Sequence, residues 1–359
     1  MELNNEINYA TFEVAQRTSK EIEKDIVANP SKYKVLTGDR PTGNLHIGHY
    51  FGSLRNRVNI QNLGVETYIV IADYQVLTDR DAFDKIAEYV YELVLDYLAC
   101  GLDPEKYHTY IFPHSHIPEL NQLLLPFLTL VSNAELNRNP TIKEEISASG
   151  QQIINGGMYV YPVHQAADIL FCKSNIVPVG KDQLPHIELT RAIARRFNTK
   201  YKPTFREPFG LLSETPVILG LDGNQKMSKS RHNAIAIKST ADETQKMIKT
   251  AKTDSERFIT YDPENRPEVA NLLRVSALCL NTTPEQLAAE IGDAGARKLK
   301  EVTTDALNTY FAPIRARRIQ LENDKPYIQS ILQRGIEQAR SVAAQTLAEV
   351  REAMNMKLW

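Results

Sequence analysis

The chain has 359 residues, of which 42% are hydrophobic and 24% charged, and its formal net charge is -2. This length and composition are typical of an ordinary globular protein with two domains. The near-neutral charge argues against a protein that coats nucleic acid, although a local basic face could still bind one structured RNA.

The cysteines and the N-terminus indicate the cellular compartment. Cys100, Cys172 and Cys279 are scattered without CxxC spacing, which argues against a zinc site, an iron–sulfur site and a disulfide framework. The first residues are polar and acidic, and no apolar run approaches the length of a membrane span. We therefore expect a cytoplasmic protein that is neither exported nor anchored in a membrane.

The first segment, residues 1–33, is predicted to be a helical N-terminal extension. Within residues 6–28, apolar side chains recur among many charged ones, at Ile7, Phe12, Ala15, Ile22 and Ile26. The Asn29-Pro30 pair ends this pattern, because proline cannot continue a helix. The sequence does not indicate what the extension does.

Residues 34–240 show the alternation of strands and helices expected of a Rossmann-like catalytic domain. The pattern predicts strands at 35–38, 66–73, 108–112 and 175–179, and helices at 45–62, 82–101, 161–173 and 182–198. This order predicts an α/β fold with a doubly wound parallel sheet. A connecting insertion at about 117–159 contains a loop rich in serine and glycine that could move over a site.

Only helical patterns occur after residue 241, notably at 297–323 and 327–355, so residues 241–359 are predicted to form a C-terminal all-helical domain. Cations gather there, at Arg297, Lys298, Lys300, Arg315, Arg317, Arg318, Arg334 and Arg340. On composition alone, a solvated helix face explains these cations as well as an RNA-binding surface does.

Residues 46–49 (His-Ile-Gly-His) and 226–230 (Lys-Met-Ser-Lys-Ser) are the most informative motifs. The first follows a turn at the end of the first predicted strand, where the N-terminus of a helix attracts phosphate and Gly48 lets an adenine lie close to the backbone. The second follows the turn Gly223-Asn224, and the ammonium groups of Lys226 and Lys229 suit the β- and γ-phosphates. Both motifs therefore predict a site for a nucleoside triphosphate.

These motifs are rich in hydrogen-bond donors and poor in carboxylates. If a carboxylate attacks the α-phosphate, it is already ionised at neutral pH, so positioning and charge stabilisation are needed but a general base is not. Mg²⁺ would be held mostly by substrate oxygens and water, and no metal-ligating residue is predicted.

The helix predicted at 161–173 carries a polar face. Tyr161, Gln165 and Asp168 stand at i, i+4 and i+7 and therefore lie on one side of the helix. This side is either a solvated face or the wall of a pocket in which Asp168 accepts a hydrogen bond from a substrate ring. Spacing alone leaves both interpretations open.

The two short motifs resemble the HIGH and KMSKS motifs of class I aminoacyl-tRNA synthetases. The segments TGDRPTGNLHIGHYFGSL, YPVHQAADILFCKSNIVPVGKDQLPHIELTRAIARRFN and GLDGNQKMSKS are similar to tryptophanyl-tRNA synthetases of the bacterial type. The likeness covers nearly all of residues 34–356, with TDSE at 253–256 and ANLL at 270–273.

This resemblance implies a tryptophan–tRNA ligase. Such an enzyme activates L-tryptophan with ATP and Mg²⁺, releases pyrophosphate, and transfers tryptophan to the 3′-terminal ribose of tRNA(Trp). The resemblance also implies a homodimer, and it implies that the helical domain recognises the anticodon region of the tRNA.

The resemblance implies three groups of site residues. The residues that handle the triphosphate and are counted as catalytic are His46, His49, Lys226 and Lys229. Those that bind other parts of ATP are Arg40, Gly48, Lys143, Asp182, Met227 and Ser228. Those that bind tryptophan are Gly38, Tyr161, Gln165, Asp168, Val179 and Gln183, with Asp168 accepting from the indole N–H and Tyr161 and Gln183 holding the α-amino group.

Three positions depart from the pattern of bacterial tryptophanyl-tRNA synthetases. Gln165 replaces a methionine, Arg40 stands where glutamine is frequent, and Glu145 stands where a second lysine is frequent. Gln165 together with Tyr161 and Asp168 also resembles the corresponding helix of tyrosyl-tRNA synthetase, which is the nearest alternative, but the segment VPVGKDQ favours tryptophan. A small-molecule nucleotidyltransferase and a catalytically silent RNA-binding relative are further alternatives, and the intact pair of motifs argues against both.

Overall fold

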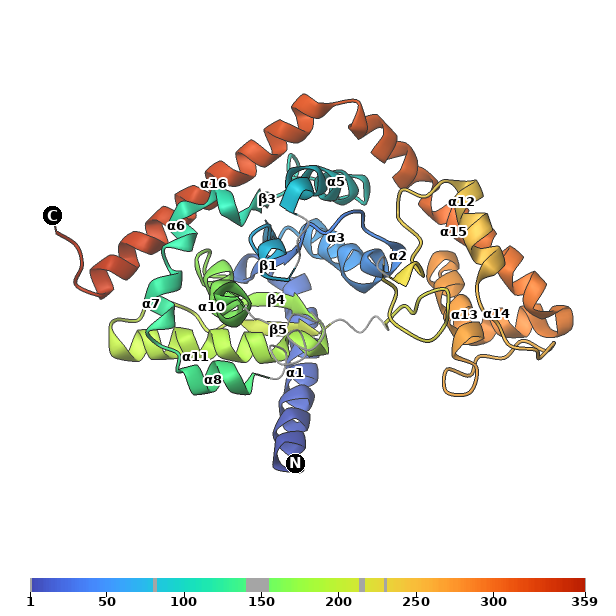
Figure 1. Cartoon of the computed structure of the whole chain (residues 1–359), viewed down its shortest axis with the longest axis horizontal. Coiled ribbons are helices and arrows are strands. Elements are labelled where there is room, and N and C mark those ends of the chain that lie inside the picture. The colour runs from blue at the N-terminus through green and yellow to red at the C-terminus, as the bar shows by residue number, and fades with distance from the viewer. Residues whose placement is uncertain (1, 80–82, 140–154, 213–216, 229–230, 359) are drawn as a thin grey trace.

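The computed structural model describes residues 2–79, 83–139, 155–212, 217–228 and 231–358. At its centre is one sheet of five strands, in which each neighbouring pair is parallel and the order is β3-β2-β1-β4-β5 (Figure 1). The strands are β1 (Lys34–Asp39), β2 (Glu66–Ile71), β3 (Thr109–Pro113), β4 (Ile176–Val179) and β5 (Phe209–Leu212). The predicted Rossmann-like parallel sheet is confirmed. Strand β5 was not predicted, because four residues directly after Pro208 are too short a run to show a period.

Helices make up most of the remaining described chain. They are α1 (Glu2–Ala28), α2 (Ile47–His49), α3 (Arg55–Asn62), α4 (Val76–Asp79), α5 (Ile86–Ala99), α6 (Pro118–Asn121), α7 (Leu124–Leu128), α8 (Asn133–Arg138), α10 (Gly156–Leu170), α11 (Leu184–Lys200), α12 (Ala241–Thr250), α13 (Pro267–Leu280), α14 (Pro284–Ile291), α15 (Gly295–Glu322) and α16 (Lys325–Ala353). A π-helical turn, Tyr50–Leu54, joins α2 to α3 within the helix predicted at 45–62. None of the described helices is both long and apolar enough to cross a membrane.

The order of the strands reverses at β1. The chain runs from β1 outward through β2 to β3, and later returns to the other side of β1 to add β4 and then β5. In open parallel sheets of this kind, ligands bind beyond the carboxyl ends of the strands at the point of reversal. The fold therefore predicts a site at the carboxyl ends of β1 and β4.

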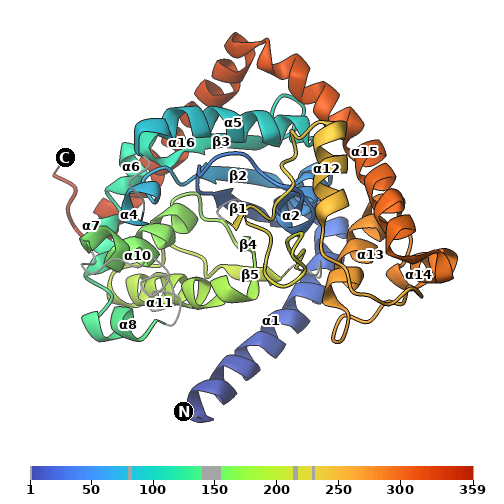
Figure 2. The same ribbon diagram turned by 45° about the vertical axis from the view of Figure 1, so that its right-hand side comes forward.

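Helices from the two ends of the chain cover the two edge strands. Helix α1 packs on β5, where the hydroxyl of Ser19 accepts a hydrogen bond from the Leu212 amide at 2.9 Å. Helix α16 packs on β3, and a side chain at Gly335 would collide with the backbone carbonyl of Ile111. Figures 1 and 2 show α16 crossing back over the sheet, while α12 to α15 lie together at one side.

Candidate active site

An open cavity of about 1840 Å³ lies at the carboxyl ends of β1 and β4. Its lining includes these predicted site residues: Gly38, Arg40, His46, Gly48, His49, Tyr161, Gln165, Asp168, Val179, Asp182, Gln183, Lys226 and Met227. Ser228 is described but is not part of this lining. Lys143, Glu145 and Lys229 lie outside the described residues.

His46 and His49 form a reciprocal cap at the start of α2. Nδ1 of His46 accepts from the His49 amide at 3.3 Å, and Nδ1 of His49 accepts from the His46 amide at 3.2 Å. The two rings stack with their centroids 3.6 Å apart. Because each Nδ1 is an acceptor, the proton of each neutral ring is on Nε2. Both imidazoles are thus fixed as Nε2–H donors at the N-terminus of a helix, where the helix dipole also favours an anion.

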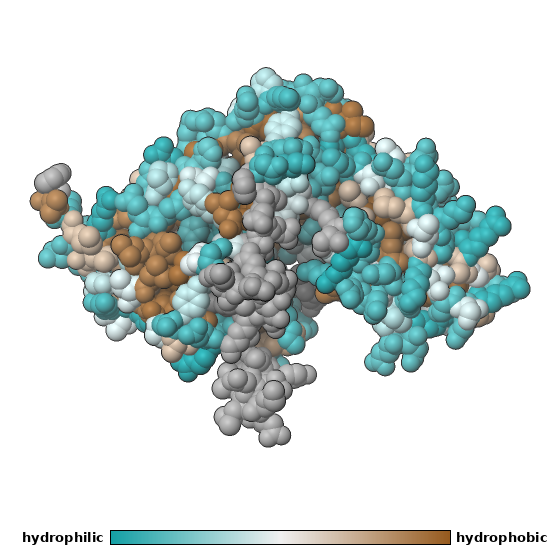
Figure 3. Space-filling model, in the orientation of Figure 1, coloured by the Kyte–Doolittle hydropathy of each residue, from teal (hydrophilic) through white to brown (hydrophobic). Residues whose placement is uncertain are grey.

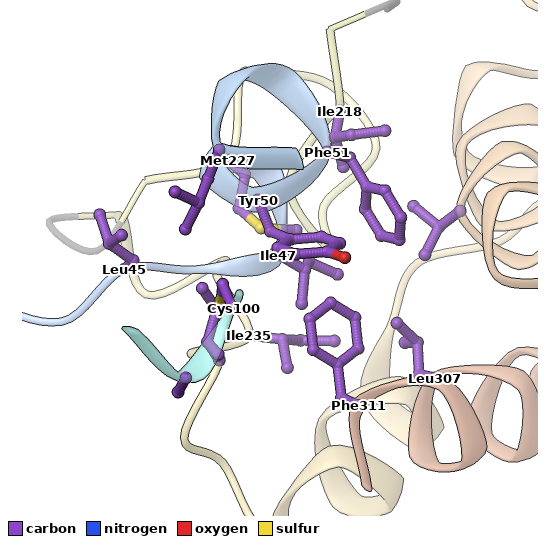
Figure 4. Packing of buried hydrophobic residues seen from close by; sticks show 14 of the residues in the cluster. Leu45, Ile47, Tyr50, Phe51, Cys100, Ile218, Met227, Ile235, Leu307 and Phe311 are labelled. Carbon is purple, nitrogen blue, oxygen red and sulfur yellow. The ribbon is translucent and has the colours of Figure 1, made fainter. Parts of the chain in front are cut away.

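The two motifs are joined through the segment that follows the second one. The Ile47 amide donates to the Ile235 carbonyl at 3.0 Å, and the Ile237 amide donates to the Leu45 carbonyl at 2.9 Å. A Cβ at Gly48 would lie 3.0 Å from the His46 ring, a tight contact that glycine avoids, and 3.4 Å from Cβ of Met227, an ordinary contact distance that places the two motifs side by side. Figure 4 shows Ile47, Met227 and Ile235 in one apolar cluster with Phe311 of α15.

Two buried asparagines hold the loop that contains the second motif, and sequence reasoning missed both. Oδ1 of Asn233 accepts from the Ser228 amide at 2.8 Å, and its Nδ2 donates to Asp222 at 3.1 Å. On α13, Asn271 accepts from the Leu219 amide at 2.9 Å and donates to the Leu219 carbonyl at 3.1 Å. Asn271 stands in the ANLL stretch, but no local pattern indicates that its side chain pairs with a loop 52 residues earlier.

Asp168 is buried beneath the cavity with a side chain that is 4% exposed. Nδ1–H of His114 donates to its Oδ1 at 3.0 Å, and the Tyr74 amide donates to Nε2 of the same ring at 3.0 Å. Within the described part of the chain, His114 is the only hydrogen-bond donor to this carboxylate. Burial alone would lower the pKa of His114, but the carboxylates of Asp168 and Asp73 raise it above its usual value. His114 directly follows β3 and lies two residues after the end predicted for this strand at residue 112, and this position beyond a strand end is the signal that could have revealed it.

His114, His164 and Asp168 also bring three potential metal ligands within 4.8 Å of one another. The ring nitrogens of His164 are already engaged, since Nε2–H donates to Asn121 at 2.7 Å and Nδ1 accepts from Gln75 at 3.2 Å. Both nitrogens of His114 are engaged as well. A metal ion would have to displace these hydrogen bonds, so we interpret the cluster as a network that orients Asp168.

Tyr161 and His186 form a second buried pair on the wall of the cavity. Their side chains are hydrogen-bonded, with the Tyr161 hydroxyl 3.1 Å from Nε2 of His186. Burial lowers the pKa of His186 to about 4, and the nearby charge of Arg40 acts in the same direction. The ring is therefore neutral at physiological pH, and it holds the phenol of Tyr161 at the cavity.

The carboxyl end of β1 carries an ion pair that sequence reasoning also missed. Arg57 contacts both carboxylate oxygens of Asp39, at 2.5 and 3.1 Å, and the Tyr97 hydroxyl donates to the same carboxylate at 2.6 Å. Burial alone would raise the pKa of Asp39, but Arg57 and Tyr97 lower it to about 2. At the preceding residue, Gly38, a Cβ would lie 1.9 Å from the Val70 carbonyl oxygen, so only glycine fits between β1 and β2 here.

Comparison with known proteins identifies the family. The model for the family described as tRNA synthetases class I (W and Y) matches residues 29–312. Tryptophan–tRNA ligase of Clostridium longisporum is 43% identical over 336 residues, which span 91% of this chain and 98% of the relative. The chain belongs to the tryptophan–tRNA ligase family.

Other members of the tryptophan–tRNA ligase family agree with this assignment. The ligase of Treponema pallidum (strain Nichols) is 40% identical over 331 residues, which span 90% of this chain and 97% of the relative. The crystal structure of tryptophanyl-tRNA synthetase from Campylobacter jejuni, complexed with ADP and tryptophan, is 30% identical with a TM-score of 0.78, and the match covers 90% of this chain and 99% of that one. The chain is thus a class I aminoacyl-tRNA synthetase with a Rossmann-like fold.

Proposed function

We propose that the enzyme activates L-tryptophan with ATP, forming tryptophanyl-adenylate and pyrophosphate, and then transfers tryptophan to the 3′-terminal ribose of tRNA(Trp). The observation that carries this proposal is that one cavity brings together the two nucleotide motifs and the buried carboxylate of Asp168. The names of the relatives and the tryptophan and ADP in the C. jejuni complex support the same reaction.

In the first step Asp168 accepts the indole N–H, while Tyr161 and Gln183 hold the α-amino group. His114 fixes the orientation of the Asp168 carboxylate before the substrate arrives, so little reorganisation is needed on binding. Phenylalanine offers no N–H and would leave this buried acceptor unpaired, which is the kind of loss that produces strong discrimination.

ATP lies between the two motifs in this proposal. At Gly48 the adenine lies against the backbone. Other parts of the nucleotide are contacted by Arg40, Asp182, Met227, Ser228 and Lys143. The Nε2–H groups of His46 and His49 and the ammonium groups of Lys226 and Lys229 face the phosphates. The tryptophan carboxylate attacks the α-phosphorus, the bond to the bridging oxygen of the β-phosphate breaks, and these donors stabilise the charge on the departing pyrophosphate.

We also infer that ATP enters as its Mg²⁺ complex. Several carboxylates of the described cavity are already engaged by the protein: Asp39 by Arg57 and Tyr97, Asp168 by His114, Glu135 by Arg196 and Glu188 by Arg191. This donor set fits an ion that keeps phosphate oxygens and water as its main ligands and partly neutralises the triphosphate.

In the second step a hydroxyl of the terminal ribose attacks the carbonyl carbon of tryptophanyl-adenylate, and AMP leaves. We infer that residues 241–359 contact the anticodon region of the tRNA. We further place the reaction in the cytoplasm, since Cys100, Cys172 and Cys279 are free thiols, as expected in a reducing compartment.

We infer a homodimer whose interface includes α7. Leu125 on this helix is 72% exposed, and Leu124, Leu128 and Val131, close to it in the chain, are half-buried against the core. Figure 3 shows apolar surface on the side of the molecule where α7 lies. Leu125→Asp should convert the dimer to a monomer in sedimentation equilibrium, whereas Phe258→Asp, at another exposed apolar side chain, should not. If Leu125→Asp remains a dimer, α7 is not part of the interface.

The reaction is tested by ATP–pyrophosphate exchange with purified enzyme, without tRNA, driven in turn by tryptophan, tyrosine and phenylalanine. We expect exchange with tryptophan alone. Exchange with tyrosine would keep the chemistry but change the substrate, and no exchange with any of the three would contradict the activation step.

A further inference from the structure

Helix α1 contributes a wall to the substrate cavity. The family match begins at residue 29, directly after α1 ends at Ala28, so α1 precedes the part of the chain that the family model covers. The α1 side chains that line the cavity are Phe12, Gln16, Ser19, Lys20 and Glu23. Their positions, in steps of about one helical turn with Ser19 and Lys20 adjacent, place them on one face of the helix.

An adjacent face of α1 is anchored to the sheet. Ile22 and Ile26 are 7% and 4% exposed and pack in a small core with residues of β1, β4 and β5. The Ser19 hydroxyl accepts from the Leu212 amide on β5 at 2.9 Å and donates to the Ala15 carbonyl at 2.7 Å. The helix is therefore docked on the edge strand β5, which holds its cavity face in place.

Phe12 connects this face to residues predicted to bind substrate. Its ring lies 4.5 Å from the Lys181 ammonium, a cation–π contact. Lys181 begins the 3-10 turn Lys181–Gln183, which contains Asp182 and Gln183. The turn is closed by a backbone hydrogen bond, in which the Gln183 amide donates to the Gly180 carbonyl at 3.1 Å. A contact that fixes Lys181 therefore also constrains its two neighbours.

We propose that α1 is a positioning element of the substrate site, and that Phe12, through Lys181, holds Asp182 and Gln183 in place for ATP and tryptophan. The ligand bounded by this wall is the aminoacyl-adenylate, a purine nucleotide joined to an amino acid. This assignment of the ligand rests on the proposed function. Phe12 does not touch the reacting atoms, so its loss should weaken substrate binding rather than slow the chemical step.

The test uses tryptophan-dependent ATP–pyrophosphate exchange by the full-length enzyme. Phe12→Ala should raise the KM for ATP and for tryptophan about two- to fivefold, the range expected for an exposed cation–π contact, while kcat changes little. Phe12→Tyr keeps an aromatic ring and should restore the wild-type KM values. Val14→Ala is the matched control, since Val14 is exposed on the same helix and does not line the cavity.

A double-mutant cycle decides whether Phe12 acts through Lys181. If it does, Lys181→Gln should raise the same KM values, and the double variant should be no worse than the more affected single variant. Additive effects, or unchanged KM values in both single variants, would overturn the proposal. Failure of the proposed function is distinguishable, because the wild-type enzyme would then show no tryptophan-dependent exchange at all.

Discussion

At the scale of single residues, the site depends on polar groups whose proton positions are set by neighbours. One carboxylate oxygen of Asp168 accepts a hydrogen bond from His114. His46 and His49 each accept a backbone hydrogen bond through Nδ1. Each of these groups is oriented by the protein before any substrate binds. Such preorganisation is what electrostatic catalysis and selective binding require.

Asp168→Ala removes the proposed acceptor for the indole N–H. We expect discrimination between tryptophan and phenylalanine, measured as the ratio of kcat/KM in pyrophosphate exchange, to fall by one or more orders of magnitude. Asp305→Ala, an exposed carboxylate on α15, serves as the control. Unchanged discrimination would show that Asp168 has only a structural role.

His186 should make stability depend on pH. Its pKa is about 4 in the folded protein and about 6.5 when the chain is unfolded, so below pH 6.5 the unfolded chain binds a proton that the folded chain does not. Stability from this group is therefore lost as pH falls from 6.5 toward 4. When the pH is lowered from 7 to 5, the free energy of unfolding measured in urea should fall by about 2 kcal/mol more for wild type than for His186→Gln. Equal losses in the two proteins would contradict this burial effect.

At the scale of elements, the loop that carries Lys226 is attached to α13 by Asn271. Asn271→Ala should lower kcat for exchange about tenfold or less and destabilise the fold by about 1–3 kcal/mol, because the Leu219 amide and carbonyl lose their partner. The KM for tryptophan should stay close to wild type. The control is Asn265→Ala, which removes an exposed asparagine in the turn before α13. If kcat in Asn271→Ala equals that of wild type, Asn271 does not position the loop for catalysis.

The same elements show what a sequence can predict here. The strand–helix alternation and the two motifs have local signatures, so the parallel sheet and the parts of the cavity lining that the motifs supply were predictable. Asn233, Asn271 and His114 act through hydrogen bonds to distant segments, and such contacts leave no periodic pattern. Arg318 shows the converse, because it reads as one of several surface cations but is 2% exposed.

At the scale of the whole molecule, Arg318 joins the helical region to both motifs. It donates to Asp96 at 2.7 Å and to Glu92 at 2.6 Å, both on α5. Asp96 accepts from the Leu45 amide at 2.9 Å, just before the first motif, and Glu92 pairs with Lys238 at 3.1 Å, after the second. One side chain of α15 thereby fixes the segments on either side of the nucleotide site.

Arg318→Met should therefore be strongly destabilising, because it leaves the carboxylate of Asp96 buried without its partner. We expect the free energy of unfolding, measured by chemical denaturation, to fall by about 3–5 kcal/mol. Arg317→Met is the matched control, because the side chain of Arg317, the neighbour of Arg318, is exposed. This substitution should change the free energy of unfolding by about 0.5 kcal/mol or less. Similar losses in the two variants would show that the buried network contributes little.

The placement of α16 on β3 has a consequence for synthesis of the protein on the ribosome. Residues 325–353 follow all five strands in the chain, yet they cover the edge strand formed by residues 109–113. During translation that edge stays open until the last long helix has left the exit tunnel. A product that stops short of α16 thus presents an unpaired strand to other nascent chains, and the strand is covered only once α16 has been made and has folded onto it.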